Sequence, residues 1–287
     1  MEDAGPSRTA LTTAYARAYH QIADRPTIFT DPLAAAIVGT TTDELIELSS
    51  RTGDQVGAVL SDRARRLFFA TRSRFAEDAI AAAVATGTRQ VVILGAGLDT
   101  FAYRNPIPDL RVFELDHPAT QAWKRDRLAA AGIDVPETAT FVPVDFETQN
   151  LAVELDSAAF TRAEPAIFVW LGVVFYLTPG AARATLEYIV GQAQPVEVVF
   201  DYLQSPDTDE ERAHLRDRAD RLASAGEPFL SYIAPDEISS LLHALGFTDV
   251  EDRTAHDVIS AYLGESPEFE EKQTRVLRAS RILRASR

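Results

Sequence analysis

Residues 91–100, Val-Val-Ile-Leu-Gly-Ala-Gly-Leu-Asp-Thr, decide the fold. A short apolar run that ends in glycines is typical of a buried parallel strand leading into a binding loop. Gly95 permits a tight turn, and Gly97, on the far side of Ala96, lets the backbone approach a ligand because it has no Cβ atom. A plain strand-to-helix turn has the same pattern, so this stretch alone does not identify a ligand.

The next apolar run, residues 111–115, is followed by an acidic residue, which is a second indication of a binding site. Asp116 follows Gly95 by 21 residues. A carboxylate at that distance from the glycine turn can accept hydrogen bonds from the ribose hydroxyls of an adenosine. Glu114 is an alternative, because residues two apart lie on the same face of a strand.

Three features separate a methyltransferase from a nicotinamide-dependent oxidoreductase, which would use the same turn. Thr100 stands where the dinucleotide fingerprint has its third glycine, which supports close helix packing around a pyrophosphate. S-adenosylmethionine has no pyrophosphate. The loop also lies about ninety residues into the chain, and Leu245-Gly246-Phe247 begins a late helix–strand pair typical of methyltransferases. These features favour S-adenosylmethionine as the cofactor, with the oxidoreductase as an alternative.

Alternating strand-like and helix-like segments predict an α/β fold. We expect a Rossmann-like class I methyltransferase sheet of seven mostly parallel strands, the last antiparallel, with a helical N-terminal cap. The expected strands are 90–94, 111–115, 140–144, 166–170, 196–200, 247–252 and 275–283. We expect residues 1–287 to form one domain: the cap at 1–87, the cofactor-binding core at 88–202, a cap insertion at 203–235, and a C-terminal helix and strands at 236–287.

Composition limits the partners. The net charge of −15 repels nucleic acid and anionic membranes, and no apolar run approaches the roughly 20 residues needed to span a bilayer. The polar start of the chain and the absence of cysteine favour a cytoplasmic protein. No pair of the five histidines has metal-ligand spacing, so we expect no metal. The expected partner is a small-molecule acceptor.

Several motifs resemble the leucine carboxyl methyltransferase family, whose bacterial branch includes enzymes acting on polyketides. The resemblance covers residues from about 10 to 205. The segments that carry it are 29–33, 72–75, 91–100, 113–118, 144–146 and 172–177, with Arg104 and Lys124. It implies an S-adenosylmethionine-dependent O-methyltransferase, in which the loop from Gly95 to Asp99 contacts the cofactor.

Arg72 is the most specific of the candidate residues. At 100° per residue it falls within an apolar helical stripe, so its guanidinium should be buried and needs a partner. That partner is either an internal acid such as Asp99 or the methionine carboxylate of the cofactor. The resemblance implies the carboxylate, with Arg17 as a second basic contact; a solvated surface arginine is the alternative for Arg17.

The resemblance also implies an adenosine site. Asp116 would bind the ribose, Asp145 would accept from the adenine amino group, and Phe146 would cover the ring; Asp145 alternatively begins a helix. At Trp170-Leu171 the chain departs from the family, which usually has a glutamate where Leu171 stands, so the wall near the sulfonium becomes apolar.

No residue stands out as a general base. Tyr176 either faces the reaction centre or packs in the core, while His20 and His214 are either bases or surface residues. A carboxylate acceptor needs no base, whereas a phenol does, which favours a carboxylate. The alternative is a protein that binds S-adenosylmethionine with changed chemistry or none, such as a pseudoenzyme.

Overall fold

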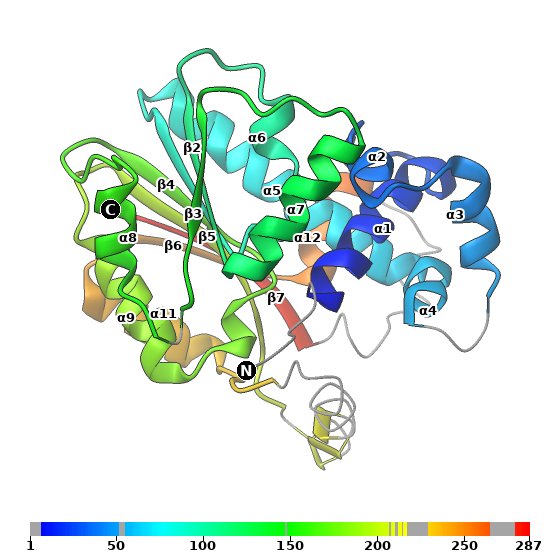
Figure 1. Ribbon diagram of the computed structural model, residues 1–287. Coiled ribbons are helices and arrows are strands. Elements are labelled where there is room, and N and C mark those ends of the chain that lie inside the picture. Colours follow the sequence, from blue (N-terminus) through cyan, green and yellow to red (C-terminus); the bar gives the residue numbers. More distant parts are fainter. Residues whose placement is uncertain are drawn as a thin grey trace.

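The computed structural model describes residues 7–51, 55–146, 148–206, 208–209, 212–213, 215–216, 229–264 and 279–287. A group of helices precedes the sheet and lies beside it (Figure 1). These are α1 (Arg8–Ala23), α2 (Ala34–Val38), α3 (Thr42–Ser49), α4 (Gln55–Ser61) and α5 (Arg63–Ala85). Helix α1 contacts each of the other four, so it is the centre of this cap.

The seven strands form one mixed sheet in the order β3-β2-β1-β4-β5-β7-β6. They are β1 (Gln90–Leu94), β2 (Arg111–Asp116), β3 (Ala139–Pro143), β4 (Ala166–Trp170), β5 (Val196–Leu203), β6 (Asp249–Thr254) and β7 (Ser280–Ser286). Strands β1 to β5 pair in parallel, and β7 runs antiparallel to both β5 and β6. The predicted Rossmann-like class I sheet with an antiparallel last strand is therefore confirmed.

The remaining helices cover the two faces of the sheet. They are α6 (Phe101–Arg104), α7 (Pro118–Ala130), α8 (Leu151–Ser157), α9 (Pro179–Val190), α11 (Pro235–Leu245) and α12 (Ala255–Leu263), with a 3₁₀ turn, η1 (Val174–Tyr176). Along β1, Val92 and Leu94 join the core under α8, α9 and α11, whereas Val91 and Ile93 join the core under α5, α6 and α12. Burial on both faces explains why this strand has no polar alternation.

Local signals set the ends of several elements. Ser7 caps α1 by accepting a hydrogen bond from the Ala10 amide, and Asp62 caps α5 in the same way from the Arg65 amide. Gly246 ends α11 in the left-handed conformation, with φ of 109°, as its position predicts. Strand β6 begins two residues later than expected, because Phe247 is buried in the core instead of pairing. The first part of the expected last strand, 275–278, lies outside the described residues.

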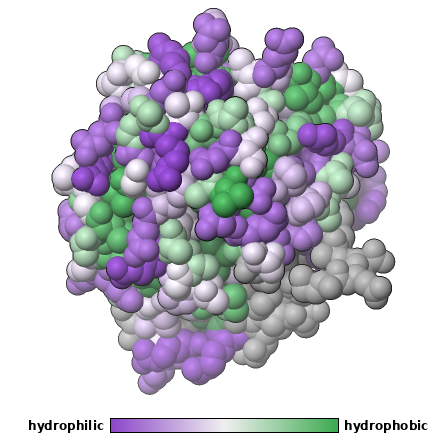
Figure 2. All heavy atoms as spheres, turned by 60° about the vertical axis from the view of Figure 1, so that its left-hand side comes forward, coloured by the Kyte–Doolittle hydropathy of each residue, from purple (hydrophilic) through white to green (hydrophobic). Residues whose placement is uncertain are grey.

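The surface is mixed in character. Figure 2 shows hydrophilic side chains spread over one face, with apolar side chains interspersed in small groups. Within the described ranges, no helix combines the length and apolar character required to cross a membrane. The division into cap, core and insertion stays a prediction.

Candidate cofactor and active site

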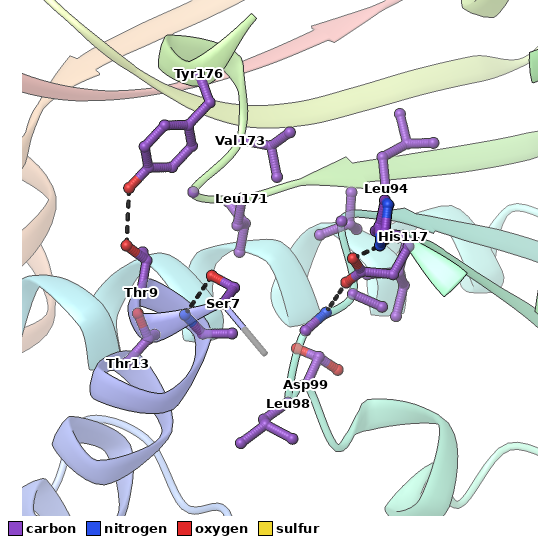
Figure 3. Close-up of a pocket in the computed structure, with 18 of the residues that line it drawn as sticks. Ser7, Thr9, Thr13, Leu94, Leu98, Asp99, His117, Leu171, Val173 and Tyr176 are labelled. Carbon is purple, nitrogen blue, oxygen red and sulfur yellow. Dashed lines mark hydrogen bonds between the residues drawn. The ribbon is translucent and has the colours of Figure 1, made fainter. Parts of the chain in front are cut away.

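One pocket lies at the carboxyl ends of the parallel strands, where open α/β sheets bind ligands. Its volume is about 310 Å³. The residues that directly follow β1, β2, β3 and β4 all line it, namely Gly95, His117, Val144 and Leu171. The start of α1 forms the opposite wall, with Ser7, Thr9 and Thr13 turned toward the strand ends (Figure 3).

The turn after β1 requires both of its glycines. Gly95 and Gly97 have φ of +67° and +46°, a region that side chains rarely adopt. A Cβ atom on Gly95 would lie 2.3 Å from Cγ2 of Val173, and one on Gly97 would lie 2.9 Å from Cβ of Ala10. Glycine at both positions is therefore what lets the turn pack closely against Val173 and Ala10 at the edge of the pocket.

Asp116 is fixed by the same loop. Its Oδ2 atom accepts a hydrogen bond of 2.5 Å from the Gly97 amide, and its Oδ1 atom accepts one of 2.7 Å from the His117 amide. Burial raises the pKa of the Asp116 carboxyl, although these two amide donors oppose the rise. Each carboxylate oxygen can accept a further hydrogen bond, so the group suits a diol such as a ribose.

Glu114 does not line the pocket, contrary to the expectation that both acids of β2 lie near the ligand. Its carboxylate is 1% exposed and lies 2.7 Å from both the Lys124 ammonium and the Tyr103 hydroxyl. Burial raises the pKa of Glu114 against the effect of Lys124. The two acids share a face of the strand, but Glu114 lies deeper beneath α6 and α7. It joins those helices to the sheet.

The acids at the ends of β3 and β1 both reach the pocket. Asp145 and Phe146 line it directly after β3. Asp145 does not begin a helix, because the N-cap of α8 is Asn150. Asp99 also lines the pocket, and its Oδ1 atom accepts a hydrogen bond from the Phe101 amide.

Arg72 is buried on α5 and lines the pocket, as its place in the apolar stripe predicts. Its acid partner is Asp201 of β5 and not Asp99: the Nη1 atom lies 2.6 Å from Oδ2 of Asp201. The ring of Phe69 lies 4.7 Å from the guanidinium carbon. The Nε atom has no hydrogen-bond partner among the described residues. Because Nε is itself closed off from the open space, Arg72 lines the pocket through another part of its side chain.

Arg17 is buried too, so the alternative of a solvated surface arginine is wrong. Its Nε atom lies 3.2 Å from Oδ2 of Asp31, and its Nη2 atom donates to the Leu98 carbonyl at 2.7 Å. Asp31 also accepts a hydrogen bond from the Thr100 hydroxyl. Arg17 lines the pocket and joins α1 to the glycine loop.

Comparison with known proteins agrees with this geometry. Residues 10–190 match the model of the leucine carboxyl methyltransferase family. The chain belongs to the leucine carboxyl methyltransferase family. This confirms the prediction of an S-adenosylmethionine-dependent methyltransferase.

Relatives and solved structures extend the match over most of the chain. The Bacillus subtilis protein named "Putative S-adenosyl-L-methionine-dependent methyltransferase YktD" is 31% identical over 278 residues, covering 88% of this chain and 90% of its own. A DUF574 family protein of Streptomyces avermitilis shares the fold with a TM-score of 0.59 at 14% identity, covering 98% of both chains. A Thermobifida fusca protein, provisionally named a methyltransferase, has a TM-score of 0.55 at 14% identity, covering 100% of this chain and 96% of its own.

The family usually has a glutamate where this chain has Leu171. Of the two cofactor contacts predicted there, Trp170 and Leu171, only Leu171 lines the pocket. Leu171 does so together with Gly172 and Val173, and its side chain makes this wall apolar. Trp170 does not, because it is still the last residue of β4 and its ring is fully buried in the core beside Phe200. A contact of Trp170 with the cofactor therefore stays a prediction, without support from this pocket.

Hydroxyl groups from two distant segments meet at the pocket. The Tyr176 hydroxyl lies 2.8 Å from the Thr9 hydroxyl, and Figure 3 shows the two groups pointing toward one another. Both residues line the pocket. The Tyr176 ring packs against Phe175 and Phe229 at centroid distances of 4.8 and 5.4 Å. Sequence reasoning found Tyr176 but missed Thr9, whose signal was its place two residues after the Ser7 cap, in the first turn of α1.

His20 is buried and lies outside the pocket, so the alternative of a surface residue is wrong, while a role as a base stays a prediction. It is 0% exposed, and its Nδ1 atom lies 3.1 Å from Oδ2 of Asp24. Its Nε2 atom accepts hydrogen bonds from the amides of Ile28 and Phe29. His20 therefore holds the segment after α1 in place. His214 lies outside the described residues.

Proposed function

We propose that this chain transfers the methyl group of S-adenosylmethionine to an oxygen atom of a small-molecule acceptor, a carboxylate or a phenol. The acceptor would be a natural product or an intermediate of its synthesis. The observation that carries the proposal is that the glycine loop, Asp116 and Arg72 line one pocket. These residues come from the sheet and from the cap, and together they match the two ends of the cofactor.

The lining residues fit S-adenosylmethionine in three respects. The Gly95–Gly97 loop lines the pocket with little side-chain bulk, which suits a ligand lying against its backbone. Asp116 would accept hydrogen bonds from the ribose, and Asp145 with Phe146 would contact the adenine. At the other end, the guanidinium group of Arg72, which lines the pocket, suits the methionine carboxylate. The bound cofactor would supply an electrophilic methyl group on its sulfonium.

The protein's own contribution would be alignment and exclusion of water. Leu171 and Val173 form an apolar wall, and the hydroxyls of Thr9 and Tyr176 stand across from it, where they would orient the acceptor oxygen. His117 is the histidine among the described lining residues, and its Nδ1 atom already accepts a hydrogen bond from the Ala119 amide. The lack of an uncommitted base in this part of the chain favours a carboxylate, which is ionised at neutral pH.

The test is a turnover assay with methyl-labelled S-adenosylmethionine and acceptors in matched pairs that differ only in carrying a carboxylate or a phenolic hydroxyl. We expect label in an ester or an aryl ether, with S-adenosylhomocysteine formed in equal amount and only when an acceptor is present. Binding of the cofactor without transfer to any acceptor would favour the alternative of a cofactor-binding pseudoenzyme. Binding of NAD in place of S-adenosylmethionine would refute the proposal.

A further inference from the structure

Asp201 is a buried acid that touches the pocket only through other residues. It lies in β5, is 2% exposed, and is not among the lining residues. Its Oδ2 atom lies 2.6 Å from Nη1 of Arg72, and its Oδ1 atom accepts a hydrogen bond of 2.5 Å from the Gly172 amide. Both partners line the pocket. One carboxylate therefore connects the charged group of one wall to the backbone of another.

The place of Asp201 in the sheet explains this double contact. Trp170 of β4 is the register partner of Phe200 of β5. The next residues along the two parallel strands are Leu171 and Asp201, so the carboxylate stands beside the point where β4 turns into the pocket. Leu171 offers no charge at this end of the site. Asp201 supplies the negative charge that Arg72 needs in order to remain buried.

The surroundings of Arg72 leave its guanidinium little freedom. Phe68 and Phe69 lie 5.9 and 4.7 Å from its central carbon. Gly172 has φ of +76°, and a Cβ atom there would lie 3.3 Å from Nη2 of Arg72. With Asp201 holding Nη1, the orientation of the planar guanidinium group relative to the pocket is set.

We propose that Asp201 is a positioning residue for the amino-acid end of the cofactor. It acts through Arg72 and the Gly172 backbone, which it holds in one arrangement, and it does not touch the ligand. The inference rests on the proposed function, in which Arg72 binds the methionine carboxylate. A purely structural ion pair would stabilise the fold without favouring one end of the ligand over the other.

The experiment compares two ligands that differ at that end. Calorimetric titration with S-adenosylhomocysteine and with adenosine, which lacks the amino-acid part, is carried out on wild type and Asp201→Asn. We expect the substitution to weaken S-adenosylhomocysteine binding at least tenfold and to change adenosine binding by less than twofold. In a chain that already carries Arg72→Met, adding Asp201→Asn should cause no further loss of S-adenosylhomocysteine affinity, because the effect passes through Arg72.

Asp24→Asn is the matched control. Asp24 is as buried as Asp201, and its Oδ1 atom pairs with Nη2 of Arg66 at 2.8 Å, but neither residue lines the pocket. We expect Asp24→Asn to lower the melting temperature while the affinity of each ligand changes by less than twofold. If Asp201→Asn does not fold, Asp201→Glu serves instead, because it keeps the charge but moves the carboxylate toward Arg72.

The outcomes separate the inference from the proposed function. The positioning role would be overturned if a folded Asp201 variant bound both ligands equally more weakly, or bound both as tightly as before. In either case the wild type would still bind S-adenosylhomocysteine. Failure of the wild type to bind S-adenosylhomocysteine would overturn the proposed function itself, and the inference with it.

Discussion

The sheet wall of the pocket, formed by Gly95, Gly97 and Asp116, is built differently from the helical wall formed by Arg17 and Arg72. On the sheet wall, the two amides that hold the Asp116 carboxylate come from positions 1 and 19 residues away in the chain. On the helical wall, Arg72 pairs with an acid 129 residues away, and Arg17 donates to a carbonyl 81 residues away.

The two walls also differ in how much their side chains contribute to the free energy of unfolding. At Asp116 the sheet wall uses backbone donors that the fold places anyway, so this side chain can be changed at a smaller cost to stability. The helical wall uses buried ion pairs, in which loss of one partner leaves an uncompensated charge. Substitution of Asp116 should therefore alter mainly binding, whereas substitutions on the helical wall should alter binding and stability together.

The largest effect is expected for Arg72→Ala. Loss of a charged hydrogen bond should lower the affinity for S-adenosylmethionine about 30-fold or more, equivalent to about 2 kcal/mol. The free energy of unfolding should fall by about 3–5 kcal/mol, because Asp201 is left buried without its cation. Calorimetric titration and urea unfolding measure the two quantities.

A double variant separates the two effects of this substitution. Arg72→Met with Asp201→Leu replaces the pair by apolar side chains, which should recover much of the stability but none of the affinity. Recovery of cofactor binding in that variant would show that the charge of Arg72 is not used by the ligand.

On the sheet wall, Asp116→Asn should lower the affinity for adenosine and for S-adenosylmethionine by about tenfold, because a charged acceptor of the ribose is lost. The free energy of unfolding should fall by only about 1 kcal/mol, because the asparagine oxygen can accept from one of the Gly97 and His117 amides but not from both. Glu114→Gln is the control from the same strand: it breaks the buried pair with Lys124 and should reduce stability without reducing adenosine affinity. If Glu114→Gln weakened adenosine binding and Asp116→Asn did not, Glu114 would be the acid that binds the ribose.

The same contrast explains how much of the site the sequence could predict. The glycine loop, Asp116, Asp145 and Phe146 were predictable because each directly follows a recognisable strand. Helical periodicity placed Arg72 in the interior, but periodicity says nothing about which distant acid meets it.

The remaining misses have the same origin in tertiary packing. The burial of His20 depends on Asp24 and on the amides of Ile28 and Phe29, which approach it only after the chain has turned back. The expected strand 166–170 coincides with β4, so its end is not the reason for the outcome at Trp170; the ring packs in the core beside Phe200 of the neighbouring strand β5, a contact that the sequence pattern does not specify.

A smaller effect is expected from pH, again on the sheet wall. Burial raises the pKa of Asp116 above its ordinary value of 3.8. As the pH falls through the raised pKa, the carboxylate gains a proton and cofactor affinity should decrease several-fold. The stability change has the opposite sign: because the folded state binds this proton more tightly than the unfolded state, ionisation of Asp116 lowers the free energy of unfolding as the pH rises from 3.8 to the raised value.

Titrations of S-adenosylhomocysteine across this pH range, on wild type and Asp116→Asn, measure the effect on binding. The asparagine variant should bind weakly and with a flatter pH dependence. If the affinity depended equally steeply on pH in both proteins, a group other than Asp116 would titrate in this range. The pH dependence would then no longer distinguish the sheet wall from the helical wall.

The smallest effect on the ligand is expected for His20→Ala, which tests where the helical wall ends. His20 lies on α1 with Arg17, but its ring bonds to Asp24 and to two backbone amides, away from the pocket. Loss of these bonds should lower the free energy of unfolding by about 1–3 kcal/mol. Cofactor affinity and the rate of methyl transfer, measured well below the melting temperature, should stay within twofold of wild type. A fall in rate of tenfold or more with cofactor binding intact would instead assign a catalytic part to His20 and extend the active site into the interior of the cap.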